Sequence, residues 1–236
     1  MTVNKRIKRQ ARQTVFMYLL TVSSLFAAST ELPEFTTEGL QHLGDTQFAV
    51  VYAKPGVAMG QYKRLYLDDT NVAFKKNWQR DRNRSSSARI SNSDMTRIKS
   101  DLAVLFRDVF TRTLEDGGYA LASEYDNDVL LIKPGIINLD IVAPESNTAG
   151  RSQTFAESAG EMTLYLELYD SVSGELLAKA LDRQRDRQTG YMRWQNRITN
   201  RAAANRILQL WADVLKQGLD EARGNPQSGQ PISQSP

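Results

Sequence analysis

Two basic stretches that contain tryptophan are the strongest candidates for chemistry in this 236-residue chain. They are residues 75–89 and 182–197. Each combines arginines, which bind phosphate and carboxylate groups in a two-pronged geometry, with an aromatic ring that can stack or insert. We predict an anionic-surface site formed by Lys75, Lys76, Trp78, Arg80, Arg82, Arg84, Arg187, Arg193, Trp194 and Arg197. The alternative is a pair of solvated loops in which neighbouring aspartates offset part of the charge.

Catalytic residue types are scarce. His42 is the only histidine, and no Gly-x-Ser-x-Gly motif supports a Ser-His-Asp triad around it, so we expect His42 to be exposed to solvent. Paired acids occur at 68–69, 115–116 and 126–128, but a glycosidase needs two carboxylates that face each other across a cleft. Aspartates in turns explain these pairs more simply. We therefore predict no enzyme activity, no metal site and no cofactor.

The N-terminal residues have the order of a secretory signal peptide. Lys5, Arg6, Lys8, Arg9 and Arg12 precede an apolar run over residues 15–26, and small residues follow at 27–29. We predict cleavage near Ser29, which gives a periplasmic protein. The alternative is a retained inner-membrane anchor, although the apolar run is shorter than the roughly 20 residues that a spanning helix needs.

The chain contains no cysteine, which excludes disulfides and a lipid anchor on a cysteine. The first 29 residues hold five of the 30 basic residues and no acid, so residues 30–236 carry 25 basic and 27 acidic side chains. Their net charge is −2, and a nucleic-acid partner is not expected.

Apolar periodicity predicts two long helices, over 93–114 and 199–223. We expect Asn92 or Ser93 to cap the first helix and Gly117-Gly118 to end it. Strands are predicted at 48–52, 62–67, 72–74, 119–123 and within 129–142, where Pro134-Gly135 should interrupt them. Residues 161–169 alternate strictly and should form a hairpin with 176–181, which places Tyr165 and Tyr169 on its second face.

Runs of strands without intervening helices predict an α+β fold, in which two long helices pack on one face of a largely antiparallel mixed sheet as a two-layer sandwich. The expected organisation is a signal peptide at 1–29, a lead-in segment at 30–46, one domain at 47–223 and a disordered tail at 224–236. Residues 68–71 are predicted to form a turn between strands. Polar residues 77–92 and the stretch 143–160 are predicted to be loops.

Four stretches together resemble a family of exported bacterial proteins, the putative bacterial lipoproteins with the domain of unknown function DUF3313. They are YKRLYLDDTNVAFKKNW, GIINLDIVAPES, YDSVSGELLAKALDRQ and ITNRAAANRILQLWADVLKQGLDE, and they fall within residues 47–222. The resemblance implies a Gram-negative envelope protein and supplies no catalytic residues. This chain lacks the cysteine that a lipoprotein would need.

The leading interpretation is an exported, non-enzymatic envelope protein, namely a periplasmic binding or accessory module. Its partner is expected to be another envelope protein, the cell wall or an anionic membrane surface. Two alternatives remain open. One is a cell-wall hydrolase that works with carboxylates, and the other is a structural or assembly subunit that uses the tyrosine face of the hairpin.

Overall fold

The computed structural model describes residues 32–85, 89–142, 154–156, 160–186, 193–195 and 197–224, without the side chains of 154–156, 193–195 and 197–199. The chain divides into two compact units, Met1–Leu32 and Pro33–Pro236, and the description concerns the second. The predicted signal peptide, most of the stretch 143–160 and the tail beyond Gly224 lie outside the described residues.

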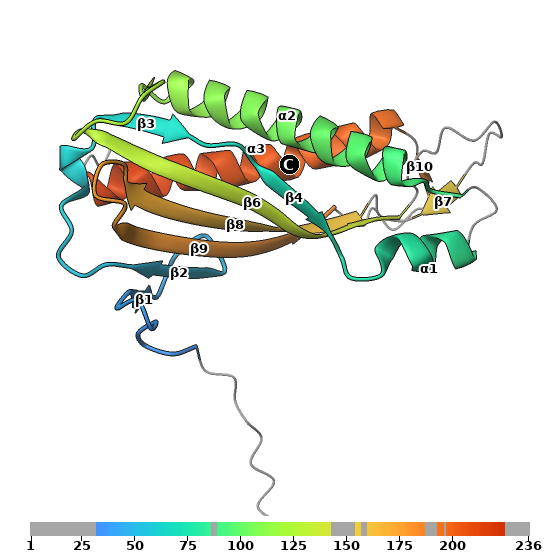
Figure 1. The fold of residues 1–236 in the computed structure, drawn as a ribbon, viewed down its shortest axis with the longest axis horizontal. Coiled ribbons are helices and arrows are strands. Elements are labelled where there is room, and N and C mark those ends of the chain that lie inside the picture. Colours follow the sequence, from blue (N-terminus) through green and yellow to red (C-terminus); the bar gives the residue numbers. More distant parts are fainter. Residues whose placement is uncertain are drawn as a thin grey trace, which may run out of the picture. The chain divides into compact units, whose positions relative to one another are not determined.

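A mixed eight-stranded sheet forms one layer (Figure 1). Its strand order is β1-β2-β9-β8-β6-β3-β5, and β4 also pairs with β6. The neighbouring strands β1, β2, β9, β8 and β6 pair antiparallel. Strands β3 and β4 pair parallel with β6, and β5 pairs parallel with β3. The strands are β1 (Gln41–Leu43), β2 (Val50–Ala53), β3 (Arg64–Leu67), β4 (Asn71–Phe74), β5 (Ala120–Leu121), β6 (Val129–Ile141), β8 (Gly160–Asp170) and β9 (Leu176–Arg185). A separate two-stranded sheet joins β7 (Thr154–Ala156) to β10 (Arg193–Gln195).

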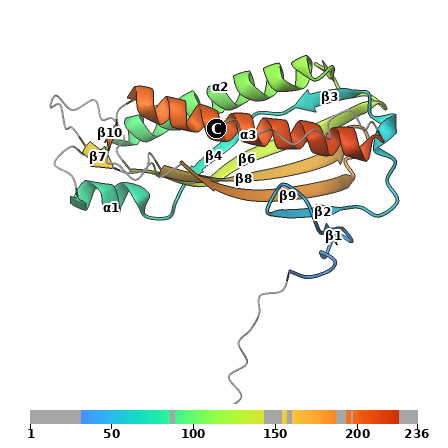
Figure 2. The same ribbon diagram turned by 180° about the vertical axis from the view of Figure 1, so that it is seen from behind.

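Two long helices, α2 (Asn92–Asp116) and α3 (Arg197–Ala222), cover one face of the sheet (Figures 1 and 2). Ser91, not Asn92 or Ser93, caps α2, because its hydroxyl accepts from the Asp94 N–H while Asp94 accepts from the Ser91 N–H. Gly118 follows α2 at φ +85°, a conformation that glycine adopts at little cost. The predicted α+β fold is confirmed.

The core lies between the helices and the sheet. The alternating residues Met162, Leu164 and Leu166 of β8 point into it, and the apolar stripes of both helices meet them. Trp211 on α3 is fully buried, and its indole N–H donates to the buried Asp182 of β9 over 2.7 Å. The periodicity of the sequence therefore places the buried faces correctly.

Three predictions about the strands were wrong. Residues 68–71 form no reversing turn, because β3 and β4 both run parallel to β6 along the same edge. Pro134-Gly135 does not interrupt β6, because Pro134 lies opposite the interval between β3 and β4, where its missing N–H is tolerated. The lead-in segment contains β1, which pairs with β2.

The predicted loop over 77–92 was also wrong in its first half, where α1 (Trp78–Ser85) forms. This short helix is polar apart from Trp78, so the sequence contains no apolar stripe that would predict it. In Figures 1 and 2, α1 lies at the same end of the domain as β7 and β10. A 3-10 turn, η1 (Met59–Gln61), completes the elements.

Candidate functional site

The first basic stretch is held in place by the side chain of Trp78. Its indole is 4% exposed and stacks on the ring of Phe74, with 4.2 Å between the centroids. The indole N–H donates to the carbonyl of Ile141 at the end of β6 over 3.3 Å. Trp78 is thus an internal anchor for α1 and is not available to stack on or insert into a ligand.

Two predicted site residues also support this anchor. Arg82 donates to one carboxylate oxygen of Asp140 over 2.7 Å, and Lys75 donates to the other over 3.3 Å. Burial raises the pKa of Asp140, but the hydrogen bonds and charges of Arg82 and Lys75 outweigh that effect and lower the pKa below its usual value. At its far side α1 is fixed by the side chain of Asn83, which bonds the backbone N–H and C=O of Ile90.

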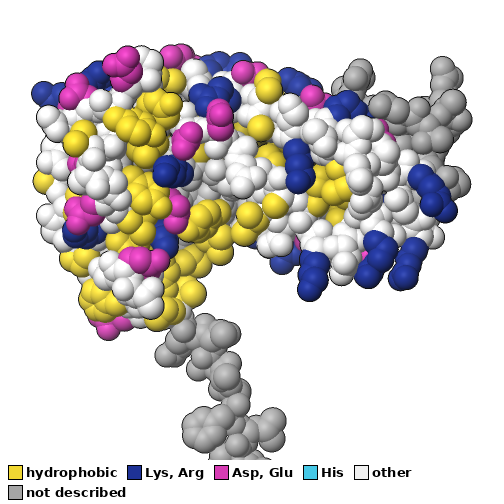
Figure 3. Space-filling view, in the orientation of Figure 1, with side chains coloured by type: hydrophobic (Ala, Val, Ile, Leu, Met, Phe, Trp, Pro, Cys, Tyr) yellow, Lys and Arg dark blue, Asp and Glu magenta, His cyan; other side chains and the backbone are white. Residues whose placement is uncertain are grey.

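The outer face of α1 carries the remaining basic residues. Arg80 and Arg84 are exposed and four residues apart, so they share one side of the helix, and the exposed Lys76 lies just before its first turn. Arg80 pairs with its neighbour Asp81 over 3.0 Å, whereas Lys76 and Arg84 form no ion pair with any described residue. In Figure 3, Lys and Arg side chains gather at the lower right, where Figure 1 places α1.

The charge of this end contrasts with the rest of the domain. Residues 75–89 hold six basic residues and one acid, a net charge of +5. All other residues after position 29 hold 19 basic and 26 acidic residues, a net charge of −7. The positive charge is therefore concentrated in one segment of an otherwise acidic domain.

The second basic stretch begins as a strand instead of a loop, because residues 182–185 belong to β9. Arg183 and Arg185 both pair with Glu161, over 2.6 and 2.8 Å. Arg187 lies outside the described residues. Arg193 and Trp194 belong to β10, opposite Ala156 and Phe155 of β7, and Arg197 is the first residue of α3, but the side chains of all three lie outside the description.

His42 is not fully exposed as predicted. It lies on β1 opposite Tyr52, and the two rings are 5.2 Å apart between centroids in a tilted arrangement. Because Tyr52 is buried and donates to the carbonyl of Pro33, the contact holds the N-terminal segment to the sheet. The arrangement indicates packing, with no catalytic partner for His42 in the described part of the chain.

The other candidate groups of the sequence also have structural partners. Arg64 forms ion pairs with Asp126 and Asp128, the former over 2.8 Å. On the second face of the hairpin, Tyr165 and Tyr169 are half-buried and their hydroxyls donate to the two oxygens of Glu167. Burial first, and then the negative Glu167, raises the pKa of Tyr169 to about 12.

A comparison with protein families gives one match. The model described as "Protein of unknown function (DUF3313)" matches residues 35–215. The chain belongs to the DUF3313 family. Its description assigns no activity, and no curated protein matches the chain. In the described part of this DUF3313 protein, no helix has both the length and the apolar character needed to cross a membrane.

Several solved structures are similar at low identity. They include the PelC dodecamer from Paraburkholderia phytofirmans, which is 10% identical with a TM-score of 0.31, covering 67% of this chain and 96% of that one. A minor lipoprotein from Acinetobacter baumannii is 12% identical with a TM-score of 0.28, covering 66% and 94%. A putative neuraminyllactose-binding hemagglutinin homolog from Helicobacter pylori is 13% identical with a TM-score of 0.34, covering 70% and 87%. Scores this low carry no inference about function.

Proposed function

We propose that this DUF3313 protein is an exported, non-enzymatic accessory protein of the cell envelope that docks on an anionic membrane surface through α1. The observation that carries the proposal is the exposed Arg80 and Arg84 on one side of a helix whose position is fixed by the buried Trp78, with the exposed Lys76 just before that helix. A rigid row of cations loses little conformational freedom on binding, and each Lys or Arg near an anionic bilayer contributes about 1 kcal/mol.

Export is supported by the sequence of the N-terminal residues. Five basic residues, an apolar run and small residues precede the domain in the order of a signal peptide. Fractionation of cells that make the protein with a C-terminal tag, combined with intact mass, tests this part. A periplasmic species that starts near Thr30 is expected, and a membrane species with its full N-terminus would replace the signal peptide with an anchor.

A non-enzymatic role is supported by the ion pairs of two acids that the fold brings together, which are not among the pairs named from the sequence. Asp140 and Glu161 face each other on β6 and β8, but each is bound by two basic side chains. Burial raises the pKa of Glu161, and Arg185 and Arg183 more than offset it, so its pKa is lowered, as is that of Asp140. A general acid in a glycosidase needs a raised pKa instead.

The docking proposal is tested by co-sedimentation of the purified mature protein with vesicles. We expect binding to vesicles of phosphatidylglycerol with phosphatidylethanolamine, and little binding to phosphatidylcholine alone. Replacing Lys76, Arg80 and Arg84 together by Gln should weaken binding roughly 100-fold at low salt, since three contacts of about 1 kcal/mol are lost. High salt should weaken the wild type in the same way.

A matched control keeps the same change in net charge but moves it elsewhere. Lys63, Arg107 and Lys133 are exposed residues outside α1, and their joint replacement by Gln should leave vesicle binding nearly unchanged. If this control weakens binding as much as the α1 variant, the overall charge and not α1 is responsible. Equal binding of wild type and α1 variant, or sedimentation with cell-wall polymer and not with vesicles, contradicts membrane docking.

A further inference from the structure

A cleft opens in the helical layer, away from the outer face of α1. It has a volume of about 1090 Å³ and lies between the N-terminal halves of α2 and α3, above the end of β6 and the start of β8. Ligand sites in proteins are typically about 300–1,000 Å³ with mostly apolar walls and a few polar groups. The volume of this cleft lies just above that range.

The cleft exists because α3 has small side chains where it faces the first half of α2. Ala202, Ala203 and Ala204 line the cleft, whereas the next turns of α3 carry Leu208 and Trp211, which fill the core. At the C-terminal side of the cleft, Gln209 donates to Thr113 over 2.9 Å and joins the helices. The opening is thus set by side-chain size along α3.

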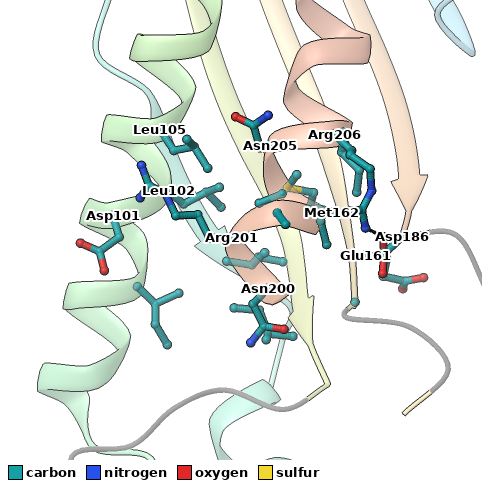
Figure 4. Close-up of a pocket in the computed structure, with 18 of the residues that line it drawn as sticks. Asp101, Leu102, Leu105, Glu161, Met162, Asp186, Asn200, Arg201, Asn205 and Arg206 are labelled. Carbon is teal, nitrogen blue, oxygen red and sulfur yellow. Dashed lines mark hydrogen bonds and ion pairs between the residues drawn. The ribbon is translucent and has the colours of Figure 1, made fainter. Parts of the chain in front are cut away.

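The floor of the cleft is aliphatic. It is formed by Ile98, Leu102 and Leu105 of α2, Leu139 and Ile141 of β6, and Met162 of β8. In Figure 4, Leu102 and Leu105 face Arg201 and Asn205 across the gap. A polypeptide backbone inserted here would bury N–H and C=O groups against side chains that cannot bond them, whereas a hydrocarbon chain has no such groups.

The mouth between the helices carries both signs of charge. Arg201 of α3 and Arg112 of α2 line it together with Asp101 and Asp108 of α2, and none of the four forms an ion pair with a described residue. The acids Glu161 and Asp186 are occupied by arginines, Asp186 by Arg206 over 2.5 Å, and Figure 4 shows these three on the other side of α3.

We infer that the cleft binds a zwitterionic phospholipid whose head group carries a primary ammonium, with an acyl chain on the aliphatic floor and the head group between α2 and α3. Arginine is suited to bind the phosphate, and an aspartate at the mouth is suited to accept from the ammonium group. The inference does not depend on docking through α1, because it concerns different residues and a different kind of contact.

The test uses the purified mature protein and a single-chain lipid below its micelle concentration, so that no bilayer is present. Calorimetric titration with lysophosphatidylethanolamine should give one bound lipid per chain. Lysophosphatidylglycerol has the same phosphate without the ammonium group and should bind about tenfold more weakly, which is the usual effect of losing one charge-assisted hydrogen bond.

Three variants separate the cleft from the general surface. Ala204→Trp should abolish binding by filling the cleft, whereas Val104→Trp, at a position on α2 that is 56% exposed and outside the cleft, should bind like the wild type. Arg201 is exposed, so Arg201→Gln should leave the fold intact. This change should weaken lipid binding about tenfold.

Absence of lysophosphatidylethanolamine binding, or equal binding by Ala204→Trp and wild type, overturns the site. Equal affinity for the two lipids overturns the head-group assignment. Vesicle binding can be absent while this titration detects lipid binding, and the reverse is also possible. The two experiments therefore test membrane docking through α1 and lipid binding in the cleft independently.

Discussion

The two halves of the helical layer are built from the same pair of helices but pack differently. In the C-terminal half, Tyr119, which follows α2, donates to Asp220 of α3, and large residues such as Phe110 of α2 and Trp211 of α3 fill the core. In the N-terminal half they enclose the cleft, with alanines on α3. The contrast shows that one continuous helix can fill the core at one end and line a cleft at the other, according to the size of its side chains.

Truncation of a leucine in each half is expected to have the largest effect on stability. Leu208 lies in the closed half and has no exposed area. Leu208→Ala should decrease the free energy of unfolding by an amount near the upper end of the range of about 2–5 kcal/mol. Leu102→Ala, on the cleft wall, should decrease the free energy of unfolding by an amount near the lower end of that range, because fewer neighbours surround its side chain. Urea unfolding of both variants measures the difference. Equal losses would mean that the N-terminal half is packed as tightly as the other.

Glycine-to-alanine changes should distinguish the sheet beneath the cleft from the C-terminal end of α2. Gly160 at the cleft has φ +148°, and an added Cβ would lie 2.1 Å from the backbone oxygen of Asp140. We expect Gly160→Ala to cost about 1–3 kcal/mol from backbone strain. Gly117, at the end of α2, has φ −76°, and its added Cβ would meet chiefly the flexible end of Lys216. Gly117→Ala should therefore change stability by less than about 1 kcal/mol in the same unfolding assay.

The smallest expected effect concerns the acid stability of the cleft end. Because the pKa of Asp140 is lower in the folded chain than its ordinary value of 3.8, the unfolded chain binds more protons as the pH falls through this range. The stabilisation is therefore present above pH 3.8 and is lost as the pH falls through the folded pKa. Asp140→Asn should flatten the dependence of unfolding on pH below about 4. An unchanged pH profile would show that Lys75 and Arg82 contribute no stability through Asp140.

Much of the fold was predictable because the spacing of apolar residues along the chain indicates the long helices and strands. The helices at 92–116 and 197–222 and the hairpin of β8 and β9 are long and strongly patterned, so burial of one face decides their structure. The short elements were less accessible. Helix α1 has one apolar anchor, Trp78, and depends on Phe74 and the carbonyl of Ile141, which are contacts with other elements.

The candidate sites show the same limit. The basic residues at 75–84 were recognised from their spacing, but burial of Trp78 and the pairing of Lys75 and Arg82 with Asp140 could not be read from that pattern. The sequence did not predict the cleft, because a run of alanines in a helix is also typical of an ordinary packed core. Its signal was the change from Ala204 to Leu208 and Trp211 along one stripe of α3, which has meaning only when the opposite helix is known.

By itself, the sequence determined the α+β class, the two long helices, the family resemblance and the concentration of positive charge at 75–89, because periodicity and composition are local properties. Tertiary structure alone decided which basic residues of 75–84 remain exposed, the parallel placement of β3 and β4 beside β6, and the cleft between α2 and α3. The physical reason is that these features are contacts between distant segments, and their free energy depends on what each side chain meets across the core or at the surface.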